Sequence, residues 1–515
     1  MNKVLLCLQS FLWASSCLAT GPIDSILFQD AAAVISFDTT TESLQVLYDA
    51  SVLVTGDTVA AIIPASEQVQ LPKNTQVIPS EGKIISPGFV DTHRHLWQTA
   101  FKTLGHNTSL PEYIMRYSEF SAAKRIFTPE DVYLSQLTGL YESLNSGVTS
   151  VLDHAHHTWS EETSLAGLQA SVDSGARVWW CYAFHNISDP TWVTDYDREA
   201  QIADFIHLSE HGPQRNSDAV SLGIAYDYFA IEHPYSIEKI ISLALSQDVS
   251  AVTTHFLGGP WGFANSPQLL NQYKFLNTSI PIVFSHASFL TLPDAELLRS
   301  TNQYVSITPE SESHYGHDNP RSQYIMDQGS LGVDTHFTFS ADIVGQARQW
   351  LQTARLRFYK EVLDNWNISP TNPVSANQAF LLATRLGGLA LHRPDLGVLA
   401  KGAKADLVVF DGNSPNMLGW EDPVAAVILH SNTGDIEHVL VNGEFRKRDF
   451  KLVVPDNYSK IQQRFVASAK RIQELWKQMP YPVLEGPYPF TPGVNYSHAV
   501  TGDVLPGWPN GYVSS

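Results

Sequence analysis

Apolar runs of strand length alternate with amphipathic, helix-like stretches through the middle of this chain. Such alternation predicts repeated β–α units and therefore a parallel sheet. Eight units over this length predict an α/β fold, a (β/α)8 or TIM barrel at residues 86–394. We expect its strands at 85–92, 148–153, 176–183, 221–226, 251–254, 280–285, 304–308 and 335–340.

Two strand-rich segments flank the expected barrel. Residues 24–85 and 395–452 contain short runs rich in Val and Ile that are joined by turns. The pair Asn442-Gly443 between apolar runs is typical of a β-hairpin. We expect both segments to pair into one small composite β-sandwich domain, and residues 453–515 to form a helix and an irregular tail.

The first residues have the pattern of a secretory signal. Lys3 precedes a short apolar run, and small residues stand at 17 and 19, so residues 1–19 are expected to be cleaved and the protein to be secreted. A membrane anchor is the alternative, but the run is too short to span a bilayer, and no membrane association is expected after cleavage. In a secreted chain six Asn-x-Ser/Thr triplets are candidate glycosylation sites. They begin at Asn107, Asn186, Asn277, Asn367, Asn457 and Asn495.

Composition narrows the class of partner. A net charge of −20 repels phosphate backbones, so no nucleic-acid partner is expected. The expected partner is a small-molecule substrate, and a homo-oligomer is compatible with the sequence. Only Cys181 remains after signal removal, so no internal disulfide is expected.

Histidines stand where expected barrel strands end. His93 and His95 follow an apolar strand, and alternate strand residues point the same way. His255 and His286 end the fifth and sixth expected strands, and Asp342 follows the eighth. Carboxyl ends of barrel strands meet at the active-site face. The alternative is a set of unrelated surface or core histidines, but the repeated placement at strand ends favours one metal site, and zinc accepts neutral imidazole nitrogens.

Other polar and aromatic residues follow the same strand ends and are expected to line a substrate pocket. Glu310 and Glu312 have a second interpretation, as solvated charges on a loop. Asp227 follows the fourth strand, and no lysine does, which disfavours a site bridged by a modified lysine. The expected pocket residues are His154, His185, Glu310, Glu312, Trp97 and Gln98.

Three segments together resemble the amidohydrolase superfamily. They are "ISPGFVDTHRHLWQT", "SGVTSVLD" and "LGVLAKGAKADLVVFDGNSP". The resemblance is to the branch of cytosine and S-adenosylhomocysteine deaminases and triazine chlorohydrolases. It covers about residues 24–452. It implies a TIM barrel with a composite β-sandwich and one divalent metal, zinc or iron. It implies that His93, His95 and His255 bind this metal. Asp342 is implied as a further ligand that takes a proton from water, and His286 as the residue that polarises the substrate.

The expected activity is hydrolysis of a C–N bond in a cyclic or aryl-linked small molecule by a metal-activated water. One departure stands out: Gly258 occupies the place where deaminases of this branch carry a proton-transferring Glu. Glu310 or Glu312 would have to replace it from another loop. A lyase such as a decarboxylase on the same metal site, and a non-catalytic scaffold, are the alternatives.

Overall fold

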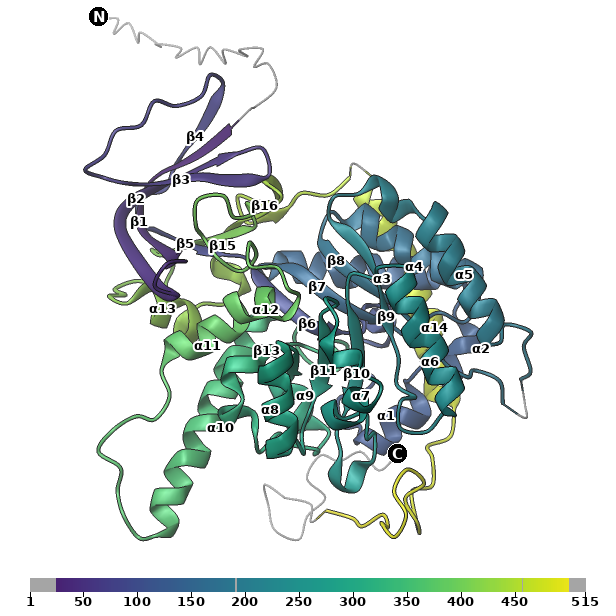
Figure 1. Cartoon of the computed structure of the whole chain (residues 1–515). Coiled ribbons are helices and arrows are strands. Elements are labelled where there is room, and N and C mark those ends of the chain that lie inside the picture. The colour runs from purple at the N-terminus through teal and green to yellow at the C-terminus, as the bar shows by residue number, and fades with distance from the viewer. Residues whose placement is uncertain (1–24, 190–191, 456, 500–515) are drawn as a thin grey trace, which may run out of the picture.

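The computed structural model describes residues 25–189, 192–455 and 457–499 (Figure 1). The expected signal at 1–19 lies outside these residues. Within them, an eight-stranded parallel sheet curls into a barrel, with helices around it (Figure 1). Its strands, in spatial order, are β6 (Phe89–Arg94), β7 (Val148–Ala155), β8 (Arg177–Ala183), β9 (Val220–Ala225), β10 (Val252–Phe256), β11 (Ile282–His286), β12 (Tyr304–Ile307) and β13 (Gly329–Leu331).

The barrel is closed by the chain just after β13. There the backbone N–H of Asp334 donates to the carbonyl of His93 at 2.8 Å, and Arg94 and Asp334 form a parallel bridge. The expected eighth strand at 335–340 is therefore wrong. The strand is Gly329–Leu331, only three residues long, and 335–340 is a turn-rich segment that leads into α10.

Helices start where the sequence caps them. Thr128 accepts from the N–H of Asp131 in a capping box and Pro129 takes the first helical position of α3, because its missing N–H costs nothing there. Helix α4 ends at Gly175, whose φ of 72° is the left-handed conformation that glycine adopts easily. The main helices around the barrel are α3 (Pro129–Asn145), α4 (Glu161–Ser174), α5 (Arg198–His211), α6 (Pro234–Ser246), α7 (Pro267–Gln272), α8 (Leu292–Thr301) and α10 (Ile343–Asp364). Other helices are α1 (Leu110–Arg116), α2 (Ala123–Ile126), α9 (Pro309–His314), α11 (Ala376–Ala383), α12 (Arg385–Ala390) and α13 (Pro423–Ala425).

The two ends of the chain share a second sheet of nine strands, which stands beside the barrel (Figure 1). Strand β14 from the C-terminal part pairs antiparallel with β5 from the N-terminal part, so neither segment completes the sheet alone. The strands are β1 (Ser25–Asp38), β2 (Ser43–Thr55), β3 (Thr58–Pro64), β4 (Thr75–Pro79), β5 (Lys83–Pro87), β14 (Leu407–Asp411), β15 (Ile436–Val441), β16 (Glu444–Arg448) and β17 (Lys451–Leu452).

The C-terminal part of the chain returns to the barrel. Helix α14 (Tyr458–Gln478) buries Ile472 and Trp476 against an aromatic cluster that includes Phe101 and Phe127. Its neighbour Trp97 is also in this cluster, packed on Trp159 with ring centroids 4.9 Å apart. Among the described residues no helix combines the length and apolar character needed to cross a membrane.

Candidate active site

Four histidines from three barrel strands converge at the carboxyl end of the barrel. The ring of His93 lies 4.8 Å from that of His95, 4.8 Å from that of His255 and 5.2 Å from that of His286, measured between centroids. His93 and His95 are 0% and 1% exposed. The alternation of β6 places both side chains on the inner side of the barrel mouth.

The carboxylate of this cluster is Asp334, not the expected Asp342. Asp334 Oδ1 lies 3.4 Å from His93 Nε2 and 3.1 Å from His95 Nε2, and its Oδ2 accepts from Ser311 Oγ at 2.5 Å. Asp342 instead caps α10 by accepting from the N–H of Val344 at 3.0 Å. The error follows from the misplaced eighth strand, since Asp334 lies three residues after the end of the true strand β13.

The remaining ring nitrogens of these histidines are held by neighbours. His93 Nδ1 pairs with Ser285 Oγ at 2.8 Å, and His95 Nδ1 with the carbonyl of His154 at 3.0 Å. His255 Nδ1 faces Asp227 Oδ2 at 2.8 Å. Each of these contacts fixes one nitrogen and leaves Nε2 of the same ring directed at the shared centre, as in protein metal sites.

The donor set fits one divalent metal ion. His93 Nε2 is buried and makes no hydrogen bond to any described residue, and a buried polar atom in that state requires an explanation. The Nε2 atoms of His95 and His255 lie only 3.3 Å apart. Ligand atoms of His93, His95 and His255 all fall within 4.8 Å of one another, as do those of His93, His286 and Asp334. Imidazole nitrogens with one carboxylate are a typical zinc ligand set.

The charges of the site are those of a cation-binding centre. Burial lowers the pKa of His93 to about 3, so this ring is neutral at neutral pH. Burial alone would favour a protonated Asp334, but its interactions with His93 and His95 hold the pKa of this carboxyl well below its usual range. A neutral imidazole at His93 and an ionised carboxylate at Asp334 are the protonation states that metal ligands require.

His286 ends β11 with a φ of 72°, a conformation that is uncommon outside glycine and typical of functional sites. Its Nδ1 pairs with Thr308 Oγ1 at 2.8 Å, and its ring meets that of His317 at 4.8 Å. Asn319 donates to its carbonyl at 2.6 Å. The ring is therefore held from several sides.

Glu312 lies behind His286, with Oε1 4.0 Å from His286 Nδ1. The same oxygen accepts from the N–H of Thr308 at 2.9 Å and from Asn319 Nδ2 at 3.1 Å. Burial raises the pKa of Glu312 to about 8. This carboxyl is thus protonated at neutral pH and supports His286 rather than meeting solvent.

Glu312 makes stability depend on pH. Its folded-state pKa of about 8 lies above the ordinary 4.5, so its contribution is complete below pH 4.5 and is lost as pH rises toward 8. Glu312→Gln keeps the accepting oxygen and removes the titration. We expect the variant to gain roughly 2–4 kcal/mol over the wild type between pH 5 and 8, since one pKa unit is about 1.4 kcal/mol. Urea unfolding at both pH values measures this, and parallel stability curves would contradict it.

Three other residues expected to line the pocket are His154, His185 and Gln98. His154 reaches the centre and lies 3.4 Å from Asp227 through Nε2. His185 is buried behind the pocket with Nε2 on the carbonyl of Thr158 at 3.1 Å. Gln98 donates to the hydroxyl of Tyr113 at 3.0 Å, beside the site.

Two of the expected substrate contacts are corrected by the structure. Trp97 packs in the aromatic cluster under α14. Its ring is fully buried among other aromatic rings there. The carboxylate of Glu310 instead accepts from Gln346 Nε2 at 3.0 Å, near the start of α10.

Sequence reasoning missed Glu119, which lies between α1 and α2, far along the chain from any strand end. Its Oε2 lies 3.7 Å from His156 Nδ1, and His156 stacks on His95 with ring centroids 4.0 Å apart. Burial raises the pKa of Glu119 to about 7. No sequence pattern marks this residue, since a loop rather than a strand end brings it to the histidine cluster.

Comparisons with known proteins place these features in a family context. Residues 84–446 match the sequence profile of the Amidohydrolase family. A 5'-deoxyadenosine deaminase of Methanobrevibacter smithii is 24% identical, over 82% of this chain and 93% of the relative. A 5-methylthioadenosine/S-adenosylhomocysteine deaminase of Acetivibrio thermocellus is 23% identical, over 78% and 89%.

Solved structures share the fold. An adenosine deaminase from Xanthomonas campestris with bound zinc superimposes with a TM-score of 0.74 at 18% identity, covering 88% of this chain and 99% of that one. An atrazine chlorohydrolase from Arthrobacter aurescens complexed with zinc has a TM-score of 0.72 at 20% identity, covering 86% and 100%. At these identities the likeness establishes the arrangement of barrel and second sheet.

The relatives correct the expectation of a secreted glycoprotein with a signal. They are archaeal and bacterial deaminases of 5'-deoxyadenosine or of 5-methylthioadenosine and S-adenosylhomocysteine, and nothing in them or in the described residues supports a signal, secretion or glycosylation. The six triplet asparagines are exposed, but exposure is the ordinary state of asparagine and does not indicate a glycan.

Proposed function

The chain belongs to the amidohydrolase family, and we propose that it removes the exocyclic amino group from the purine-like ring of a nucleoside derivative by hydrolysis at one zinc ion. The sequence-based prediction of a hydrolase that acts on a C–N bond of a cyclic small molecule is confirmed by the family and by deaminase relatives. The observation that carries the proposal is that His93 and His95 lie within ligand distance of both His255 and Asp334.

Substrate class is supported by the relatives rather than by the pocket. Two groups of them are deaminases of 5'-deoxyadenosine and of 5-methylthioadenosine or S-adenosylhomocysteine. All of these substrates carry an amino group on an aromatic nitrogen ring. Zinc is supported by the zinc-bound neighbours and by a ligand set of imidazoles and one carboxylate.

In this proposal His93, His95, His255 and Asp334 hold the ion. When bound, a divalent ion lowers the pKa of a coordinated water from about 15.7 to about 7 and so supplies a nucleophile. Asp334 is the base for the water proton, since Ser311 fixes one carboxylate oxygen and the other faces the centre. His286, fixed through Nδ1, presents Nε2 to the developing negative charge on the ring.

Gly258 does not supply an acid for the leaving group. Its φ is 73°, and an added Cβ would stand 3.3 Å from both Phe256 and Phe289. Glycine is therefore favoured at this position over a residue with a side chain. In the proposal, Glu119 is the acid that protonates the leaving group. The ring of His156 lies between Glu119 and His95, and a pKa of about 7 lets Glu119 both give and take a proton at neutral pH.

Metal removal tests the proposal directly. Dialysis against a chelator is expected to abolish ammonia release from 5'-deoxyadenosine and related nucleosides, and added zinc to restore it in the wild type. His93→Ala is expected to lower kcat by about 10³-fold or more and not to recover with zinc, because the nucleophile is no longer generated. Glu474→Ala, on the outer side of α14, is the control and should behave as wild type.

Product analysis separates hydrolysis from the alternatives. Reaction in ¹⁸O-water should place one labelled oxygen on the ring of the product. An unlabelled product would indicate a lyase, and metal-independent turnover or no turnover of any amino-substituted heterocycle by zinc-loaded protein would contradict the proposed function.

A further inference from the structure

A second His-x-His pair stands beside the first. His154 belongs to β7 and His156 follows it, just as His93 belongs to β6 and His95 follows that strand. Strands β6 and β7 are neighbours in the barrel. Alternation again places both side chains on the inner side of the barrel mouth. The first pair belongs to the site already described, whereas the second is not used by the proposed reaction.

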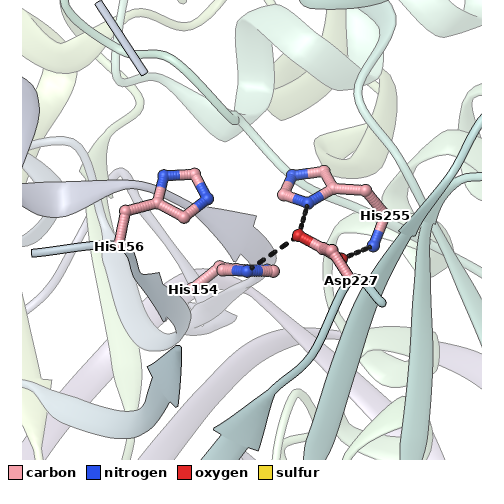
Figure 2. A group of neighbouring side chains, drawn as sticks. All are labelled: His154, His156, Asp227 and His255. Carbon is pink, nitrogen blue, oxygen red and sulfur yellow. Dashed lines mark hydrogen bonds and ion pairs between the residues drawn. The ribbon is translucent and has the colours of Figure 1, made fainter. Parts of the chain in front are cut away.

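Asp227, which follows β9, completes a cluster with this pair. One ligand atom from each of His154, His156, Asp227 and His255 lies within 4.8 Å of the others. Figure 2 shows the carboxylate of Asp227 between the rings of His154 and His255, with His156 opposite. Asp227 Oδ2 is 3.4 Å from His154 Nε2 and 2.8 Å from His255 Nδ1.

Several ring nitrogens of the cluster make no hydrogen bond, although Glu119 Oε2 lies 3.7 Å from His156 Nδ1. His154 Nδ1 and both ring nitrogens of His156 are buried and make no hydrogen bond to any described residue. The two residues are only 1% and 3% exposed. A buried polar atom without a partner is rare in folded proteins, and each of the two rings can give one nitrogen to a shared ligand.

Buried histidines without a ligand are a real alternative, and His157 shows what they look like. Both of its ring nitrogens are also unpaired, but its ring faces Gly167 and Trp180, with no carboxylate in reach among its described contacts. His154 and His156 differ because the carboxylate of Asp227 lies within their cluster, 3.4 Å from His154 Nε2.

We propose that His154, His156 and Asp227 bind a second divalent cation of the zinc class, next to the first. Two imidazoles and a carboxylate are ligands that zinc accepts, and three protein ligands leave a fourth position open. His255 stands between the two sites, with Nε2 toward His95 and Nδ1 toward Asp227. The barrel mouth is then a two-ion centre with separate ligand sets from adjacent strands, which goes beyond the single ion of the proposed function.

Zinc stoichiometry tests this without any substrate. Apoprotein is titrated with zinc, and bound metal is measured by mass spectrometry and calorimetry. We expect two zinc ions per wild-type chain and one per chain of the His154→Asn/His156→Asn variant. His157→Asn, a buried neighbour on the same segment, should retain two. One ion at saturation in the wild type, or two in the double variant, overturns the proposal.

A measurement on the unaltered protein covers the case in which the double variant does not fold. Wild-type crystals soaked in zinc are measured at the zinc absorption edge. Two anomalous peaks, one beside His93 and His95 and one beside His154 and His156, are expected. A single peak beside the first pair would overturn the second site while leaving the proposed function intact, and no peak at the first pair would contradict the proposed function instead.

Discussion

Asp334→Asn is expected to reduce kcat by about 10²–10⁴-fold, the range typical for loss of a positioned acid or base. The carboxylate contacts His93 and His95 at 3.4 and 3.1 Å and is held by Ser311. Asparagine keeps the shape and the Ser311 partner but cannot accept the water proton, and it is a weaker ligand for a cation. Steady-state kinetics with zinc-saturated protein measures the effect, together with bound zinc.

The matched control is Asp342→Asn. This side chain caps α10 through the N–H of Val344, and asparagine caps a helix nearly as well as aspartate. We expect kcat within about two-fold of wild type, and Asp342→Ala to cost about 1 kcal/mol of stability without changing kcat. The assignment of Asp334 fails if Asp342→Asn loses activity and Asp334→Asn does not.

The architecture was readable from the sequence because its signals are periodic. Most barrel strands are buried on both faces, so they appear as apolar runs bounded by turns, and seven of the eight expected positions overlap a strand. The exception is β13, whose three residues are too few to show a pattern. The segment 335–340 looked more strand-like because of its Phe and Thr content, although it closes no ladder among the described residues.

The site residues that lie at the ends of barrel strands could be predicted from the sequence. His93, His95, His255 and His286 lie at strand ends and could be placed by alternation alone, and the structure brings them together. Groups delivered by loops could not be placed. Glu119 comes from the segment between α1 and α2, and Glu310 on α9 pairs with Gln346 although it is two residues from Glu312. Such differences depend on tertiary packing, which sequence periodicity does not encode.

A buried ion pair connects the barrel to the second sheet, and its removal is the change for which we expect the second large effect, a loss of stability. Arg177, at the start of barrel strand β8, binds Asp406 next to β14 of the second sheet through two hydrogen bonds of 2.9 and 3.0 Å. Both side chains are nearly inaccessible, at 3% and 2% exposure. Asp406 also accepts from the N–H of Asn442, in the turn between β15 and β16. One carboxylate therefore connects the barrel to β14 and to this turn of the second sheet.

Asp406→Ala is therefore expected to lower the free energy of unfolding by about 3–5 kcal/mol, because it leaves the Arg177 guanidinium buried without its counter-charge. Arg177→Met combined with Asp406→Leu removes both charges, and we expect it to recover most of that loss, since replacing a buried pair by apolar groups is often nearly neutral. Denaturant unfolding of the three variants beside the wild type measures this cycle. An Asp406→Ala loss below about 1 kcal/mol would place the pair in the class of exposed ion pairs and would mean that apolar packing alone holds the second sheet against the barrel.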